Sequence, residues 1–206
     1  MAKKKKESFF WTSYSDLMTS LFFVMLVLFI LTVALMHNRH KATAQQLEKV
    51  KELYESIKQI DTTYFKYDST YKRHTLKNIQ VKFARGSSDI NDLSKSDIKK
   101  LCEAGRAIQT FMTNAKDSIT NAEYMLIIEG QSSKDGYVRN NELSYERALA
   151  LVEMWRRNDI KFDTLPCELI ITGSGQSSRF REQPDNRHNA ANQRFVIHII
   201  PKPGNF

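Results

Sequence analysis

The chain has 206 residues, 26% of them charged, with a formal net charge of +8, which is enough for one modest domain plus accessory segments. Apart from the run Lys3–Lys6, the basic residues are spread along the chain, so no nucleic-acid partner is expected. No Ser-His-Asp grouping, metal-ligand cluster or phosphate-binding loop stands out, and His188 and His198 look isolated. The sequence therefore favours neither an enzyme nor a bound cofactor.

Residues 9–36 are predicted to form a transmembrane helix. The run from Leu17 to Met36 contains no charge and matches the about 20 apolar residues that cross a hydrocarbon core. Short basic flanks such as Lys3–Lys6 tend to stay in the cytoplasm, so residues 1–8 are predicted to be a cytoplasmic tail and the residues after the transmembrane helix are predicted to be periplasmic. The run is longer than the apolar region of about 7–15 residues in a cleaved signal peptide, which disfavours that alternative. We expect a single-pass protein of a bacterial inner membrane.

Asp16 stands at the start of this membrane segment. A charged side chain inside a membrane costs several kcal/mol, so such residues are rare and usually functional. The positions three and four residues away share its helix face, and all of them carry hydroxyl groups: Thr12, Ser13, Thr19 and Ser20. This pattern favours a carboxylate that carries protons or sodium ions, and the alternative is a carboxylate at the membrane surface that caps the helix. A single helix cannot enclose an ion path, so an ion carrier would need a partner with further membrane helices.

Residues 37–80 are predicted to be a periplasmic helical linker, with a helix over 42–64 and a polar stretch over 65–80. Within the helix, apolar residues recur at spacings of three and four: Val50, Leu53, Ile57, Ile60 and Tyr64. This spacing predicts either the seam of a parallel homodimeric coiled coil or a helix packed on the following domain. The two interpretations are equally supported.

Residues 81–200 alternate between strand and helix signals. The expected strands are Val81–Phe83, Tyr124–Ile128, Glu168–Thr172 and Phe195–Ile200. The expected helices are one opened by Ser94, with Ile98, Leu101, Ala104, Ile108 and Phe111 on one face, and one over Ser144–Trp155. A loop is expected over Gly173–Arg187. The pattern predicts a periplasmic α+β domain, a β-α-β-α-β sandwich, followed by a C-terminal tail over 201–206.

The chain has two cysteines, Cys102 and Cys167. An oxidising periplasm would permit a disulfide between them, and two separate thiols are equally compatible with the sequence.

The segment Phe10-Trp11-Thr12-Ser13-Tyr14-Ser15-Asp16-Leu17-Met18-Thr19 resembles the membrane signature of the MotB family of ion-driven motor subunits. Its residue pattern is most similar to that of the MotB-like subunit of the Zorya anti-phage defence system, ZorB. The resemblance implies that the Asp16 carboxylate takes up a proton and then releases it, in repeated cycles.

The C-terminal region resembles the OmpA/MotB peptidoglycan-binding domain over roughly residues 80–200. The similar blocks are Ile128-Glu129-Gly130, Asn140-x-x-Leu143-Ser144-x-x-Arg147-Ala148, Gly173-x-Gly175 and Asn192-Gln193-Arg194-Phe195-Val196. The resemblance implies an OmpA-like fold that binds peptidoglycan.

The implied wall-binding residues are Asn140, Leu143 and Arg147. The family's acidic residue after the second strand is replaced by Ser133, and Asp135 stands two residues further on and is the candidate substitute. The alternative is a purely structural domain in which Asn140 and Ser144 cap a helix and Arg147 packs its stem.

Together the two resemblances imply a stator subunit. Two copies of this chain would sit inside a MotA-like or ZorA-like multi-pass partner, expected in five copies, and the periplasmic domains would hold peptidoglycan. The expected output is anti-phage defence. The alternatives are a flagellar or gliding motility stator and a passive OmpA-like envelope tether.

Overall fold

The computed structural model describes residues 3–58, 60–79, 81–118, 123–177, 181–186 and 190–202. The chain divides into two compact units, Met1–Lys49 and Val50–Phe206.

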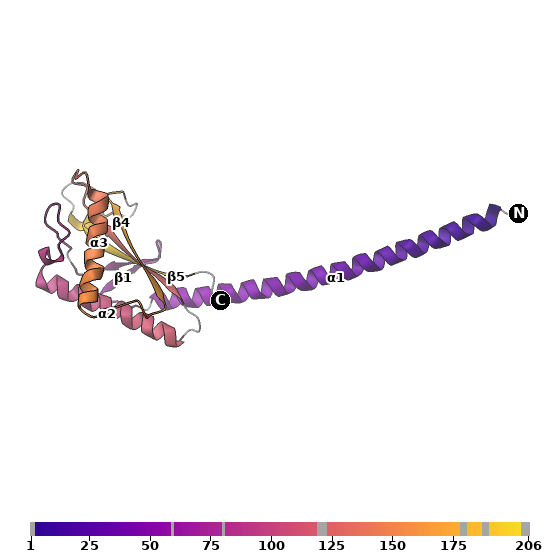
Figure 1. Cartoon of the computed structure of the whole chain (residues 1–206), viewed down its shortest axis with the longest axis horizontal. Coiled ribbons are helices and arrows are strands. Elements are labelled where there is room, and N and C mark those ends of the chain that lie inside the picture. Colours follow the sequence, from indigo (N-terminus) through magenta and orange to yellow (C-terminus); the bar gives the residue numbers. More distant parts are fainter. Residues whose placement is uncertain are drawn as a thin grey trace. The chain divides into compact units, whose positions relative to one another are not determined.

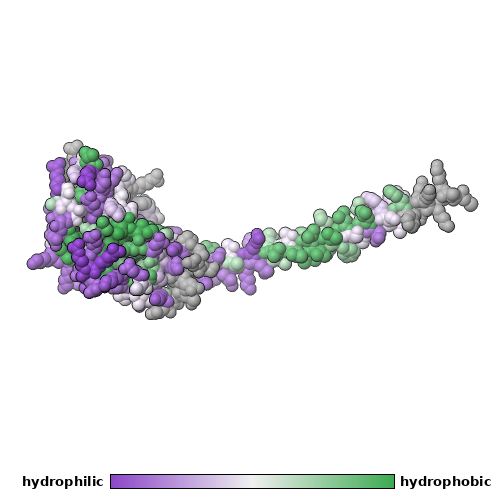
Figure 2. Space-filling view, viewed as in Figure 1, coloured by the Kyte–Doolittle hydropathy of each residue, from purple (hydrophilic) through white to green (hydrophobic). Residues whose placement is uncertain are grey.

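The first unit lies within one long helix, α1 (Lys3–Lys58) (Figure 1). We expected two helices, over 9–36 and 42–64, but the residues between them include no glycine or proline to interrupt helical hydrogen bonding. The helix also ends at Lys58, earlier than expected. All side chains from Phe10 to Met36 are exposed in the chain alone, and Figure 2 shows the apolar stretch along this helix. Within the described residues, α1 is the one helix long and apolar enough to cross a membrane.

The last turns of α1 belong to the second unit and pack into its core. Leu53, Ile57 and Ile60 have exposed fractions of 0%, 1% and 3%. The hydroxyl groups of Ser56 and Tyr124 lie 3.3 Å apart, which ties the helix to the sheet. The coiled-coil interpretation of this spacing is therefore wrong, because three of the five residues expected to face a second copy, Leu53, Ile57 and Ile60, are buried in the core of this chain's own domain.

A five-stranded mixed sheet forms the centre of the domain. Its strands are β1 (Phe65–Asp68), β2 (Arg73–Leu76), β3 (Tyr124–Gln131), β4 (Cys167–Gly175) and β5 (Arg194–Pro201). Their order is β1-β2-β5-β3-β4, with β3 and β4 parallel and the other pairs antiparallel.

The first part of the sheet corrects two expectations. Residues 65–80 were expected to be a polar linker, but they contain β1 and β2, which pair as an antiparallel hairpin and bury Phe65, Arg73 and His74. Val81–Phe83 was expected to be a strand. Val81 and Phe83 are buried, as the alternation indicated, but the segment is not part of a described strand.

Two helices cover one face of the sheet. The helix α2 (Lys95–Ser118) begins after Ser94, whose hydroxyl accepts from the Asp97 amide at 3.0 Å, as expected of an N-cap. The helix α3 (Asn140–Arg157) packs on β3 and β4. It is joined to α2 by the indole of Trp155, which donates to the Leu101 carbonyl at 2.8 Å. Short 3-10 helices span Ile90–Asp92 (η1) and Ala190–Asn192 (η2).

The core lies between the helices and the sheet. From β3, Tyr124, Leu126 and Ile128 are all 0% exposed, so the alternate residues Glu129 and Gln131 face the other side of the sheet. The structure confirms the predicted architecture of a long apolar N-terminal helix followed by an α+β domain. Cys102 and Cys167 are both free thiols, and burial raises the pKa of each.

Candidate functional site

Asp16 lies on α1 with its hydroxyl neighbours on the same helix face. Thr19 Oγ1 donates to the Ser15 carbonyl at 2.7 Å, and Ser20 Oγ donates to the Leu17 carbonyl at 2.9 Å. The hydroxyl protons are therefore donated to the helix backbone, and the hydroxyl oxygens can still accept a hydrogen bond or coordinate a cation. Thr12 and Ser13 stand four and three residues before Asp16 on the same helix.

A second candidate site lies where β3 connects to α3. Asp135 Oδ1 accepts from Asn140 Nδ2 and from the Tyr137 amide, both at 3.0 Å. Partial burial by itself raises the pKa of Asp135, but these hydrogen bonds outweigh it and the net pKa is lowered. Asp135 is therefore a preorganised carboxylate at neutral pH.

Arg147 supplies the opposite charge on the first turns of α3. It is 3% exposed, its Nε donates to the Ser87 carbonyl at 2.9 Å, and its guanidinium lies 4.6 Å from the centre of the Phe83 ring. Burial lowers the pKa of Arg147 to about 10, while the charges of Asp135 and Asp92 oppose this decrease. Arg147 stays cationic at neutral pH and is electrostatically coupled to Asp135.

The other predicted wall-binding residues are placed differently. Ser133 is 5% exposed, and its hydroxyl accepts from Gln193 Nε2 at 3.1 Å, so it faces a supporting side chain. Leu143 is 4% exposed. Of the two candidates for the family's acidic position, Asp135 is the one beside Asn140 and coupled to Arg147.

Two glycines let α3 approach the sheet closely enough to form this site. A Cβ at Gly130 would lie 2.0 Å from the Ser144 carbonyl oxygen, and one at Gly173 would lie 2.3 Å from the Tyr145 amide nitrogen. Ser144 Oγ accepts from the Gly175 amide at 2.9 Å, so it joins α3 to β4 and does not cap the helix. The cap position is held by Arg139, which makes no side-chain capping bond.

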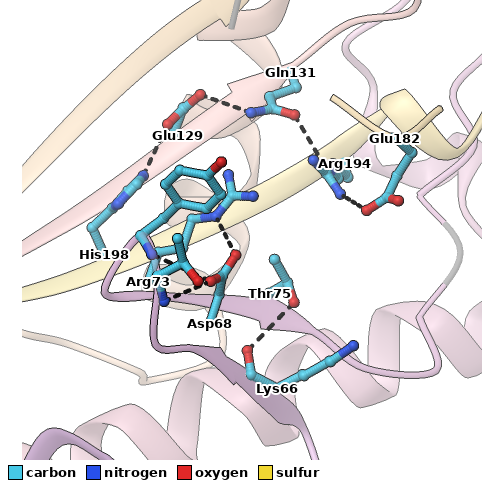
Figure 3. Close-up of polar contacts among 11 residues, drawn as sticks. Lys66, Asp68, Arg73, Thr75, Glu129, Gln131, Glu182, Arg194 and His198 are labelled. Carbon is cyan, nitrogen blue, oxygen red and sulfur yellow. Dashed lines mark hydrogen bonds and ion pairs between the residues drawn. The ribbon is translucent and has the colours of Figure 1, made fainter. Parts of the chain in front are cut away.

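A polar network occupies the other face of the sheet (Figure 3). Glu129 accepts from His198 Nε2 at 2.9 Å and from Gln131 Nε2 at 2.9 Å. Arg194 donates to Gln131 Oε1 at 3.0 Å and pairs with Glu182 at 2.6 Å. The expectation that His198 is isolated is wrong, because antiparallel pairing of β3 and β5 brings it to Glu129; His188 lies outside the described residues.

Glu129 is held in its ionised form. Burial by itself raises its pKa, but the hydrogen bonds from His198, Ser174 and Gln131 and the charge of His198 outweigh it and lower the pKa to about 2. The sequence contained no signal for this network, since its members are spread over β3, β4, β5 and the loop before β5.

No protein-family model matches the chain. No curated protein matches it either.

Solved structures similar to this chain include MotB-like and OmpA-like domains. A putative MotB-like protein from Desulfovibrio vulgaris is 15% identical, with 78% of this chain and 94% of that chain covered and a TM-score of 0.46. The periplasmic domain of MotB (residues 64-256) is 10% identical, with 67% of each chain covered and a TM-score of 0.44. The OmpA-like domain of FopA1 from Francisella tularensis is 16% identical, with 66% of this chain and 79% of that chain covered and a TM-score of 0.42.

Proposed function

We propose that this chain is a wall-anchored stator subunit of an ion-driven membrane motor, with Asp16 as the ion carrier. The observation that carries the proposal is that Asp16 is the sole acidic residue between Ser8 and Leu47, in a stretch of α1, Phe10–Met36, whose apolar side chains are exposed. A lone carboxylate kept at this cost needs a function that uses its charge.

A carboxylate in this position can take up a proton or a sodium ion from one side and release it to the other. One elementary charge that moves through a membrane potential of about 100 mV gains about 2.3 kcal/mol. Since one helix cannot enclose an ion path, the motor requires a MotA-like multi-pass partner. We propose that five copies of this partner surround two copies of this chain.

Torque requires that one component be held still, and peptidoglycan is the rigid body available. We propose that the periplasmic domain binds the peptide stem through Asp135 and Arg147. The Asp135 carboxylate matches a ligand ammonium, and the Arg147 guanidinium matches a ligand carboxylate. Asn140 orients the Asp135 carboxylate through its bond at 3.0 Å.

We further propose that the output is anti-phage defence, with a ZorA-like partner. This rests on the wording of the segment from Phe10 to Thr19, which resembles the Zorya form.

The deciding experiment compares Asp16→Asn with Glu48→Gln in the full chain, co-expressed with its multi-pass partner. Both variants replace a carboxyl by an amide on α1, but Glu48 lies outside the apolar run. In proteoliposomes with an imposed proton or sodium gradient, we expect Asp16→Asn to abolish ion flux and Glu48→Gln to leave it unchanged. If Asp16→Asn conducts and functions like the natural chain, the passive tether is correct and the motor is excluded.

The output is read in the same strains. A defence motor restores resistance in a plaque assay and leaves swimming unchanged, and Asp16→Asn removes the resistance. Restored swimming without resistance would identify a motility stator.

A further inference from the structure

Arg181 connects three separate segments beside the candidate wall-binding site. Its Nη1 donates to the Ser132 carbonyl at 2.9 Å and to the Gly175 carbonyl at 3.3 Å, and its Nε pairs with Asp185 Oδ1 at 2.8 Å. The side chain is 4% exposed. Arg181 therefore joins the loop after β3, the end of β4 and residues 181–186, which we name the strap.

The contacts of Arg181 converge on the first residue of the loop that carries Asp135. The Ser132 amide donates to the Gly175 carbonyl at 3.0 Å, and its hydroxyl donates to the Asn140 carbonyl at 3.3 Å. Ser132 is 1% exposed, so it has almost no contact with water. Because Asp135 follows three residues later and itself binds Asn140, the position of Ser132 helps to set the position of the carboxylate.

Asp185 keeps the buried guanidinium neutralised and is itself held from two further sides. It accepts from Asn192 Nδ2 at 3.3 Å, and Lys134 Nζ lies 3.7 Å from its second oxygen. Lys134 belongs to the same loop as Asp135, so the strap contacts the loop at two points.

The bonds of Arg181 are of the strong kind, since a charged donor to a carbonyl is worth roughly twice a neutral hydrogen bond. Its Nη2 is buried and has no hydrogen-bond partner within the part of the chain that the structure describes. Such an unpaired buried donor carries a desolvation cost.

We propose that Arg181 is a positioning residue for wall binding: it holds residues 132–139, here called the ligand loop, in the geometry in which Asp135 accepts from Asn140. This inference rests on the proposed binding of peptidoglycan. Arg181 acts through the Ser132 carbonyl and does not touch the ligand itself.

The first test uses the full chain in detergent micelles and cosedimentation with purified diaminopimelate-type peptidoglycan. Arg181→Met keeps the length of the side chain but removes every donor, and we expect about tenfold weaker binding, the loss of one charge-assisted contact. Arg181→Lys can still donate to Ser132 and should recover most of the affinity, which a mere packing role would not predict. Arg106→Met, an exposed arginine on α2, is the matched control and should bind like the natural chain.

A second measurement reads the loop without any ligand. In hydrogen exchange, Arg181→Met should selectively lose protection over the ligand loop, while the central amides of β3, Leu126–Ile128, keep theirs. General destabilisation would raise exchange in both segments.

The outcomes separate the two proposals. If the natural chain binds and Asp135→Asn does not, but Arg181→Met binds normally, the role of Arg181 is overturned. If the natural chain fails to bind peptidoglycan, the proposed wall binding is refuted, and so is the role of Arg181 in ligand binding. Unchanged loop protection in Arg181→Met would overturn the positioning role whatever the binding result.

Discussion

Replacing Glu129 by glutamine tests the polar network on the face of the sheet opposite the helices. Glu129 is 9% exposed and lies 2.9 Å from both His198 Nε2 and Gln131 Nε2. Glutamine has nearly the same shape and can still form hydrogen bonds, so the substitution mainly removes the negative charge.

The pKa of Glu129 gives the size and the sign of the effect. It falls from 4.5 to about 2 on folding, so the ionised carboxylate stabilises the folded chain above pH 4.5, and this contribution is lost as the pH falls toward 2. A shift of this size corresponds to about 3 kcal/mol at neutral pH, and a little under half of it remains at about pH 3. The difference in the free energy of unfolding between the natural chain and Glu129→Gln should therefore shrink by about half over this interval.

Chemical denaturation of the full chain in micelles, followed by fluorescence, measures this difference. The chain has two tryptophans, and a Trp11→Phe background leaves Trp155, which is 0% exposed in the domain core, as the probe. His74 also destabilises the fold in acid, because burial lowers its pKa to about 4, but it is present in both proteins and cancels from the difference. Glu52→Gln, at an exposed position of α1, is the control and should change stability by less than about 0.5 kcal/mol. A difference that is constant with pH, or no destabilisation at pH 7, would refute the reasoning.

Two further substitutions test the packing that positions the site. Gly130→Ala places a Cβ 2.0 Å from the Ser144 carbonyl oxygen, so the backbone of α3 must move. We expect the free energy of unfolding, measured by denaturation, to fall by at least about 2 kcal/mol and peptidoglycan binding to weaken. An unchanged stability would contradict the close approach. Leu53→Ala should destabilise the domain by about 2–5 kcal/mol because Leu53 is 0% exposed, whereas Leu47→Ala, at a side chain 56% exposed, should have little effect. If the two substitutions had equal effects on stability, the coiled-coil interpretation of α1 would be favoured again.

Most of the regular elements of the domain could be predicted from sequence periodicity. The face of α2 from Leu101 to Ile108 and the strands β3, β4 and β5 show the expected patterns, because each buries one side against a single core. The hairpin β1–β2 was missed, since strands of four residues with one polar face do not differ in composition from a linker. The end of α1 was left ambiguous, because a helix packed on a domain and a helix in a coiled coil have the same spacing.

The candidate wall-binding site was predicted in part. Asn140 and Arg147 follow a recognisable block, but the choice between Ser133 and Asp135 depended on which side chain faces Asn140. Arg181 and Asp185 had no sequence signal, because a loop residue that binds backbone carbonyls can do so from many positions.

The sequence by itself determined the features that depend on neighbouring residues. These are an apolar run long enough to cross a membrane, hydroxyl groups at helical spacing around the Asp16 carboxylate, and the order of the main strands and helices. The tertiary structure decided the features that depend on contacts across the chain. These include the pairing of Glu129 with His198, the hydrogen bond between Gln193 and Ser133, and the burial of Leu53 in the domain core. Local patterns arise from the fixed geometry of the helix and the strand, whereas a contact between distant residues depends on register and packing that the periodicity of a single segment does not contain.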